Sequence, residues 1–300
     1  MKTFGHIINP VIVDKSADLY RAQPITFETM RIARDFALDV VEVRLLTAQY
    51  PEDRALAPAW FQPTPDLDRS ILDIGTFQKE RKFPLLVDIF NRFYTAAPDA
   101  DYMIYSNVDI ALMPHFYLAV KRFIDAGYDA FAINRRTISE NFTGIEDIPF
   151  MFSEVGEDHP GHDCFVFKRD IYPRFILGDV CIGINWVGRV LLWNLICHSQ
   201  NFNEFKSAHL TFHLGNDKIW EGDGHSDYAA HNKREALKVL AELERQYGPF
   251  DRNKPIYPYI HDVLADDSEI RGGGGSAGMV QRIKTALKVK LQRSSSKRLG

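Results

Sequence analysis

The 300-residue sequence has only three cysteines, Cys164, Cys181 and Cys197, and their spacing matches no metal-binding pattern. An odd number of cysteines in apolar surroundings indicates reduced, buried thiols, which are typical of the cytoplasm. No run approaches the roughly 18 apolar residues that a membrane-spanning helix needs. The amino terminus lacks the small-residue cleavage site of a signal peptide, so we interpret it as a first strand. A cytoplasmic protein is therefore expected.

Acidic residues are absent from the last 31 positions, since all 40 of them lie at or before Glu269. The first 270 residues hold 28 bases and 40 acids and carry a net charge of −12, whereas the last 30 residues carry +8. An acidic body argues against nucleic acid as its main partner.

The C-terminal end divides into a flexible, glycine-rich linker over 263–278 and a basic amphipathic tail over 279–300. Helical spacing places four apolar residues of the tail on one face, among basic residues: Val280, Ile283, Leu287 and Leu291. This pattern is typical of a helix that lies on an anionic membrane surface, here the inner face of the membrane. A solvated tail or a binding site for another protein fits the pattern equally well.

The body, residues 1–262, is expected to form one α/β domain. The hydrophobic content of 45% and charged content of 25% of the whole sequence are those of a globular chain. Hydrophobic periodicity predicts alternating elements in the first half: strands 3–9, 39–48, 102–108 and 129–136, and helices 25–38 (N-capped by Thr26), 80–97 and 114–127. Such alternation favours a mostly parallel sheet flanked by helices, with ligands bound beyond the carboxyl ends of the strands.

The second half is less regular. It is expected to contain strands at 161–170 and 205–215, an all-round apolar helix over 183–199, and a long charged helix over 226–248 that Ser226 caps. Trp186 and Trp193 belong to the apolar helix and are expected to pack in the core, whereas Trp220 is better placed to stack on a sugar ring.

The stretch DYMIYSNVDIALMPHFY (101–117) ends a buried strand on two polar side chains, Asn107 and Asp109. A carboxylate at a strand end is a hard oxygen ligand that suits Mg²⁺ or Mn²⁺. The alternative is an ordinary aspartate that caps the next helix. His209 and His213 stand four apart in an expected strand and would share one face. His213, just before a turn, is the better metal ligand of the two, and a hydrogen-bonded core histidine is the alternative.

Four basic residues and one further aspartate are also candidates. Arg81, Lys82, Arg135 and Arg136 are expected near strand ends, where a guanidinium can grip phosphate oxygens, although solvated loop charges explain each of them as well. Asp163 opens an apolar strand behind a glycine turn. It either faces a pocket as a general base or only caps its own turn.

Taken in order, TFETMRIA, ERKFPLLVDIF, YMIYSNVDIALMPHFY, DAFAINRR, GHDCFVFKR and LTFHLGNDKIW resemble a nucleotide-sugar-dependent glycosyltransferase of the GT-A fold, near family 2. The resemblance spans residues 3–262. It implies a Rossmann-like fold, a nucleotide-sugar donor, a divalent metal, and a glycan or lipid-linked acceptor.

The resemblance also implies roles for individual residues. An Asp-x-Asp type motif would bind the metal and the donor diphosphate, and here Asn107 replaces its first aspartate. Asp109 and His213 would then be the metal ligands, and Arg81, Arg135 and Arg136 would face the donor phosphates. Asn107 would bond the donor ribose or a metal-bound water, and Asp163 would be the catalytic base.

Two other functions remain open from the sequence. A sugar-phosphate nucleotidyltransferase would share the architecture, but INPVIVDKSAD after the first strand lacks the glycine-rich phosphate loop that such an enzyme normally has. A catalytically silent nucleotide-sugar-binding or scaffold protein is the second alternative, and Asn107 is its only support.

Overall fold

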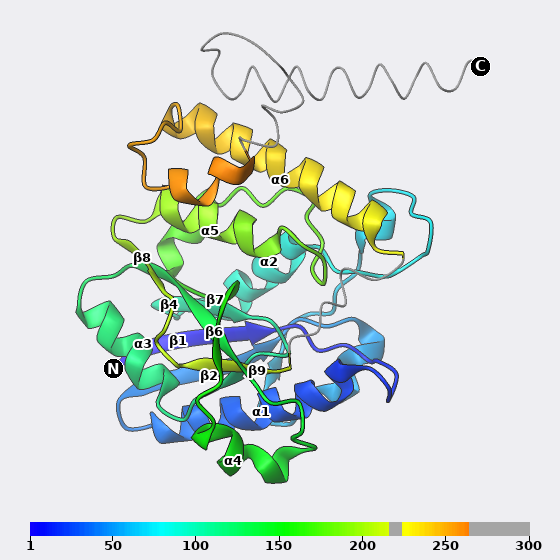
Figure 1. Cartoon of the computed structure of the whole chain (residues 1–300), viewed down its shortest axis with the longest axis vertical. Helices are drawn as coiled ribbons and strands as arrows, with labels where there is room; N and C mark the ends of the chain where they lie inside the picture. The colour runs from blue at the N-terminus through cyan, green and yellow to red at the C-terminus, as the bar shows by residue number, and fades with distance from the viewer. Residues whose placement is uncertain (216–223, 264–300) are drawn as a thin grey trace.

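The computed structural model of the protein describes residues 1–215 and 224–263. A nine-stranded sheet forms its centre (Figure 1). The order of the strands across the sheet is β3 (Gln62–Pro63), β2 (Val41–Thr47), β1 (Lys2–Ile8), β4 (Tyr102–Ser106), β7 (Glu157–Lys168), β6 (Ala130–Ile138), β9 (Thr211–Leu214) and β5 (Ala111–Leu112), and β8 (Phe202–Phe205) also pairs with β6.

The sheet is mostly parallel, as expected from the sequence. Strands β3, β2, β1 and β4 run in one direction, and β8 and β9 run parallel to β6. Strand β7 is inserted between β4 and β6 and is antiparallel to both. The beginning of β7 therefore lies at the edge where β4 and β6 end.

Helices cover both faces of the sheet (Figure 1). On one face lie α2 (Leu86–Ala96), α5 (Val187–His198) and α6 (Ser226–Tyr247), and on the other lie α1 (Asp18–Phe36), α3 (Phe116–Asp125) and the short α4 (Ile148–Ser153). Short 3₁₀ helices occur at Pro51–Leu56, Ile71–Asp73, Ile145–Asp147, Arg169–Arg174 and Tyr257–Tyr259.

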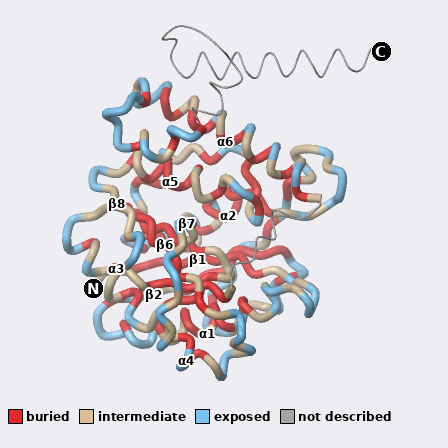
Figure 2. The backbone as a smooth tube through the Cα atoms, viewed as in Figure 1, coloured by how far each residue is buried: buried red, intermediate tan, exposed pale blue. Residues whose placement is uncertain are grey.

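Two large hydrophobic clusters hold these layers together. Phe90, Phe93 and Trp193 are fully buried in the cluster under α2, α5 and α6. Phe4 and Phe131 belong to the cluster under α1 and α3. Figure 2 shows the buried segments concentrated in the sheet and in the helix faces that contact it. The expected core position of Trp193 is confirmed.

Two helix starts and one helix cap differ from the sequence-based expectation. Helix α1 begins at Asp18, two turns before 25, because the helix continues through Pro24, which leaves Thr26 buried inside it instead of at its cap. Helix α2 begins at Leu86, since Leu85 forms a β-bridge with Cys181 and cannot be helical. Ser226 is the first residue of α6 and makes no capping hydrogen bond.

The strand expected over 205–215 is two strands, β8 and β9. Residues 206–210 separate them, and His209 has a φ of 54°, a left-handed conformation that no strand accommodates. His209 and His213 therefore do not share a strand face, and the expectation that paired them is wrong.

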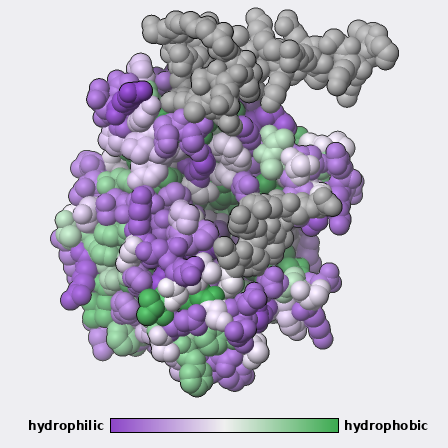
Figure 3. All heavy atoms as spheres, viewed as in Figure 1, coloured by the Kyte–Doolittle hydropathy of each residue, from purple (hydrophilic) through white to green (hydrophobic). Residues whose placement is uncertain are grey.

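No helix within the described residues is long and apolar enough to cross a membrane. The expected linker and basic tail, together with Trp220, lie outside the described residues apart from Val263. Figure 3 shows mainly hydrophilic residues over the visible face, with hydrophobic residues gathered at its lower edge, where α4 lies. Phe150 of α4 is 65% exposed there.

Candidate active site

A cleft of about 1030 Å³ opens at the carboxyl edge of the parallel strands. Seven of the residues that the sequence singles out line it, and they come from five separate parts of the chain: Arg81, Lys82, Asn107, Asp109, Arg135, Asp163 and His213. The fold thus brings together side chains up to 132 positions apart, as expected for the ligand-binding edge of an open α/β sheet.

Asp109 and His213 form a pair at the end of β4 and in β9. The His213 Nε2 lies 3.4 Å from the Asp109 Oδ2, and His213 Nδ1 lies 2.9 Å from the carbonyl oxygen of Gly215. That carbonyl can only accept, so Nδ1 carries a proton and Nε2 is the nitrogen that faces the carboxylate. Burial opposes ionisation of Asp109, but the His213 imidazole and the Arg135 guanidinium hold its carboxyl pKa below the usual value.

The pair fits a divalent cation. A backbone carbonyl that fixes the tautomer and leaves Nε2 directed at a ligand position is the usual arrangement around metal-binding histidines. The Asp109 Oδ1 is buried and has no hydrogen-bond partner among the described residues. Those residues contain no group of three His, Cys, Asp or Glu side chains that could hold a metal alone. Two protein ligands nevertheless suffice for Mg²⁺ or Mn²⁺ where substrate phosphates complete the coordination.

Asp163 enters the cleft through a bulge in β7. Ile133 of β6 pairs with Cys164, but the next residue, Asn134, pairs with His162, so Asp163 is an extra residue on its strand. Such bulges re-aim side chains beside active sites. Burial raises the pKa of the Asp163 carboxyl, although the nearby Arg135 guanidinium opposes that shift. The raised pKa of the Asp163 carboxyl is closer to the pKa that suits a general base near neutral pH.

Asn107 binds Asp163 directly. Its Nδ2 donates to Asp163 Oδ1 at 3.2 Å, and its backbone N–H donates to the Asp163 carbonyl at 3.2 Å. An aspartate at position 107 would face the Asp163 carboxylate with a second negative charge and no donor. The amide of Asn107, just after β4, can therefore bind the carboxylate of Asp163 on β7, which an aspartate at position 107 could not do.

The two consecutive arginines of β6 lie in different environments, because successive side chains of a strand point to opposite faces. Arg135 is 4% exposed, and its Nη1 lies 3.4 Å from Asp163 Oδ2. Its Nε and Nη2 are buried and have no hydrogen-bond partner among the described residues. Arg136 does not line the cleft, and its guanidinium donates to the backbone carbonyls of Glu154 and Val155. The phosphate contact expected for Arg136 therefore does not fit the structure.

The basic residues before α2 lie at the mouth of the same cleft. Arg81 has a buried Nε with no hydrogen-bond partner among the described residues. Lys82 pairs with Glu52 at 2.6 Å and lies over the ring of Tyr50 at 3.8 Å.

Two cleft residues have roles that the sequence does not reveal. Trp186 is only partly buried: it packs against the hydrophobic cluster around Trp193, as expected, but it also lines the cleft. It precedes α5 with a φ of 88°, which bulky residues rarely adopt outside functional sites. His162 lines the cleft beside Asp163, and its position next to Asp163 in GHDC is the only sequence signal that could have identified it.

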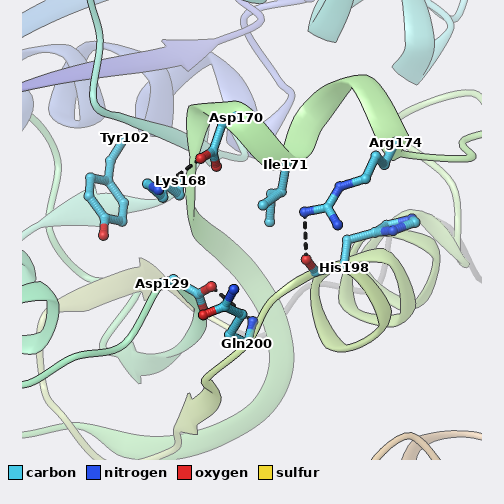
Figure 4. Close-up of a pocket in the computed structure, with 8 residues that line it drawn as sticks. All are labelled: Tyr102, Asp129, Lys168, Asp170, Ile171, Arg174, His198 and Gln200. Carbon is cyan, nitrogen blue, oxygen red and sulfur yellow. Dashed lines mark hydrogen bonds and ion pairs between the residues drawn. The ribbon is translucent and has the colours of Figure 1, made fainter.

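A second, smaller cavity of about 260 Å³ lies at the opposite edge of the sheet, by the start of β4 (Figure 4). Its cationic side chains are both engaged: Lys168 pairs with Asp170 at 2.7 Å, and Arg174 donates to the carbonyl oxygen of His198 at 2.9 Å. The larger cleft is therefore the better candidate for the functional site.

No protein-family model matches the chain, and no curated protein matches it significantly. Similar solved structures include S. aureus TarS 1–349 in complex with UDP-GlcNAc (11% identity, 89% of this chain and 80% of that chain covered, TM-score 0.44). They also include the mannosyltransferase PcManGT from Pyrobaculum calidifontis in complex with GDP-Man and Mn²⁺ (13%, 99% and 75%, TM-score 0.48). A third is the 4-diphosphocytidyl-2C-methyl-D-erythritol synthase from Anaerococcus prevotii (9%, 77% and 99%, TM-score 0.41).

Two of these three structures are glycosyltransferases by their descriptions and one is a synthase of a different class. At such low identities and TM-scores this likeness concerns the course of the chain. The chemistry of the residues that line the cleft is therefore the basis for a proposed function.

Proposed function

We propose that the protein is a glycosyltransferase, which moves a sugar from a nucleotide-diphosphate donor to an acceptor hydroxyl in polysaccharide or glycoconjugate synthesis. A glycan or a lipid-linked glycan is the proposed acceptor. One observation carries the proposal: the Asp109–His213 pair, a buried arginine with unpartnered N–H groups and a buried carboxylate converge in one cleft.

The diphosphate of the donor is proposed to lie between Asp109 and Arg135. The unpartnered Nε and Nη2 of Arg135 are suited to two phosphate oxygens, since a guanidinium binds phosphate in a bidentate manner. Arg81 approaches from the loop before α2, and Asn107 contributes an amide near the donor. Asp109 and His213 would hold Mn²⁺ or Mg²⁺, which when bound neutralises the charge that builds on the departing diphosphate.

Asp163 is the proposed catalytic base. The oxygen of the acceptor hydroxyl attacks the anomeric carbon of the donor sugar, and the hydroxyl proton goes to the Asp163 carboxylate. The bond between the anomeric carbon and the phosphate oxygen breaks, and its electron pair leaves with the nucleoside diphosphate. Asn107 and Arg135 hold Asp163 in position for this transfer.

A thermal-shift screen of nucleotides with and without Mn²⁺ tests the proposal. Stabilisation by UDP or GDP that depends on Mn²⁺ is expected for a glycosyltransferase. Preferential stabilisation by nucleoside triphosphates would indicate a nucleotidyltransferase instead, and no stabilisation by any nucleotide would indicate a scaffold.

The variant Asp109→Ala tests the cation-binding pair. We expect loss of transfer and of Mn²⁺-dependent nucleotide binding with a retained fold, measured by donor turnover and circular dichroism. Asp99→Ala, which removes a 62% exposed carboxylate at the opposite edge of the sheet, is the matched control and should behave as wild type. Near-normal turnover of Asp109→Ala would contradict the assignment of this site.

A further inference from the structure

A second titratable pair lies beside Asp163. The Nε2 of His162 lies 2.9 Å from Oε1 of Glu204, a residue of β8 whose side chain is only 5% exposed. The bulge at Asp163 creates this pair, because it shifts His162 to the sheet face that carries Asn134, the face under α5. Both His162 and Asp163 consequently line the cleft.

Glu204 is held as a carboxylate by three donors. His162 Nε2, Asn134 Nδ2 at 3.1 Å and the Tyr259 hydroxyl at 3.0 Å all bind its two oxygens. Burial opposes ionisation, but these hydrogen bonds and the charge of His162 lower the pKa of the Glu204 carboxyl to about 2. Glu204 therefore stays ionised at neutral pH and accepts a hydrogen bond from His162 Nε2–H.

This arrangement fixes the tautomer of His162. With Nε2–H bound to Glu204, the neutral imidazole carries its lone pair on Nδ1. Nδ1 has no hydrogen-bond partner among the described residues, and the imidazole is 21% exposed within the cleft. Helix α5 fixes the backbone beneath it, since a Cβ at Gly188 would lie 2.8 Å from the His162 carbonyl oxygen. A carboxylate-oriented histidine with an open nitrogen is the arrangement of a proton acceptor.

The charged and titratable groups around His162 come from every neighbouring element. The anions are Glu204 of β8 and Asp163 of β7 itself. The cations are Arg135 of β6, Lys206 at 3.6 Å from Glu204, and Arg189 in the first turn of α5, which pairs with Asp262 at 2.6 Å. The phenol of Tyr259 lies edge-on to the imidazole at 6.3 Å between ring centroids. The carboxylate of Glu204 is the group in direct contact with the ring.

We propose that His162 is a second acid–base residue of the cleft, which takes from Asp163 the proton given up by the acceptor hydroxyl. The inference rests on the proposed sugar transfer. The O–H bond of the protonated Asp163 breaks, an N–H bond forms at His162 Nδ1, and the Asp163 carboxylate is restored for the next turnover. Glu204 stabilises the resulting imidazolium, which releases its proton to water through the exposed part of the ring.

The test is the pH profile of kcat/KM for wild type and for His162→Ala, with and without added imidazole. Two groups must be deprotonated in the wild type, so the acidic limb should approach a slope of 2 at pH values where both groups become protonated. In His162→Ala we expect a slope of 1, at least a tenfold loss of kcat, and partial recovery of kcat as imidazole is added. A packing role alone would lower stability without changing the slope or giving recovery.

Glu204→Gln provides a second variant should His162→Ala not fold. It keeps the shape of the side chain but removes the charge, so the midpoint of the acidic limb should move to lower pH. Tyr259→Phe removes one hydrogen bond to Glu204 and should move the midpoint less. His159→Gln, a change of another cleft histidine on β7, is the matched control and should keep the slope of 2.

The outcomes separate this inference from the proposed function. A wild-type protein that binds no nucleoside diphosphate in calorimetry and turns over no donor refutes sugar transfer. A wild type that transfers sugar while His162→Ala keeps both the slope and the rate refutes only the role of His162.

Discussion

Arg135 offers the sharpest test of how the cleft holds phosphate, and Arg136 is its matched control. Both arginines are almost fully buried on β6, at 4% and 5% exposure, but only Arg135 lines the cleft. Replacement by methionine removes the charge of either residue and keeps most of its apolar volume. The two variants differ in which face of the strand loses its guanidinium.

In the ligand-free protein we expect Arg135→Met to change stability little. The change removes buried N–H groups that lack partners, which relieves about 1–3 kcal/mol each, but it also takes the counter-charge from buried Asp163, which costs about 3–5 kcal/mol. The two effects nearly cancel. In Arg136→Met the carbonyls of Glu154 and Val155 each lose a charged donor, at about 1–3 kcal/mol apiece, and loss of the buried, unpartnered Nε relieves about one such amount, so a net cost of about 1–3 kcal/mol is expected.

In ligand binding, by contrast, Arg135→Met should be the more strongly affected of the two variants. Loss of charged hydrogen bonds worth about 1.5–3 kcal/mol weakens nucleoside diphosphate binding roughly 10- to 150-fold in Arg135→Met. At a ligand concentration of 100 times the wild-type Kd, linkage stabilises wild type by about 2.7 kcal/mol, whereas a 30-fold weaker variant gains about 0.9 kcal/mol. At roughly 2 °C per kcal/mol, the ligand-induced rise in Tm falls from about 5 °C to about 2 °C.

The assay is differential scanning fluorimetry with Mn²⁺ and UDP or GDP, with Kd from calorimetry. Arg136→Met should show a lower Tm than wild type but the full ligand-induced rise. A full rise in Arg135→Met, or an equal loss of the rise in both variants, would refute the placement of the diphosphate at Arg135.

Three other substitutions test neighbouring parts of the site. Asp163→Asn should lower kcat about 10²- to 10⁴-fold with donor Kd unchanged, and a defect confined to donor binding would contradict its role as the base. Asn107→Asp places a like charge beside Asp163 and further raises its carboxyl pKa, so the acidic limb of the pH–rate profile should move to higher pH than in Asn107→Ala; coincident profiles would count against this contact. Because Trp186 has a positive φ, the free energy of unfolding of Trp186→Gly should be about 1 kcal/mol higher than that of Trp186→Ala in urea titrations. Equal stabilities of the two variants would show that the backbone is not strained there.

Much of the framework of the cleft follows from the sequence alone. Alternating hydrophobic periods predict the parallel strands, and parallel strands place their carboxyl ends at one edge. Hence Asp109 and Arg135 could be expected to lie near each other. The meeting of Asp109 with His213, 104 positions later, follows from the same edge rule once β9 is recognised as a strand.

Local backbone geometry was the part that sequence patterns did not predict. A period-2 pattern does not show where a bulge inserts a residue, so the exposure of both His162 and Asp163 to the cleft could not be foreseen. Nor does an apolar run show where its helix begins. Trp186 reads as part of the helix but stands just before it in a left-handed conformation. Glu204 gave no signal because its partner, His162, is 42 positions away.

The reversed direction of β7 separates the two halves of the cleft along the chain. Arg135, a proposed phosphate contact, lies towards the carboxyl end of β6. The proposed acid–base residues, His162 and Asp163, lie in the first half of β7, which follows the surface segment 139–156 that includes α4. That segment does not itself line the cleft, but Arg21, which does, donates to the carbonyl oxygens of Glu140 and Phe142. Changes in the segment can therefore alter the cleft at Arg21, away from the residues of the proposed diphosphate site.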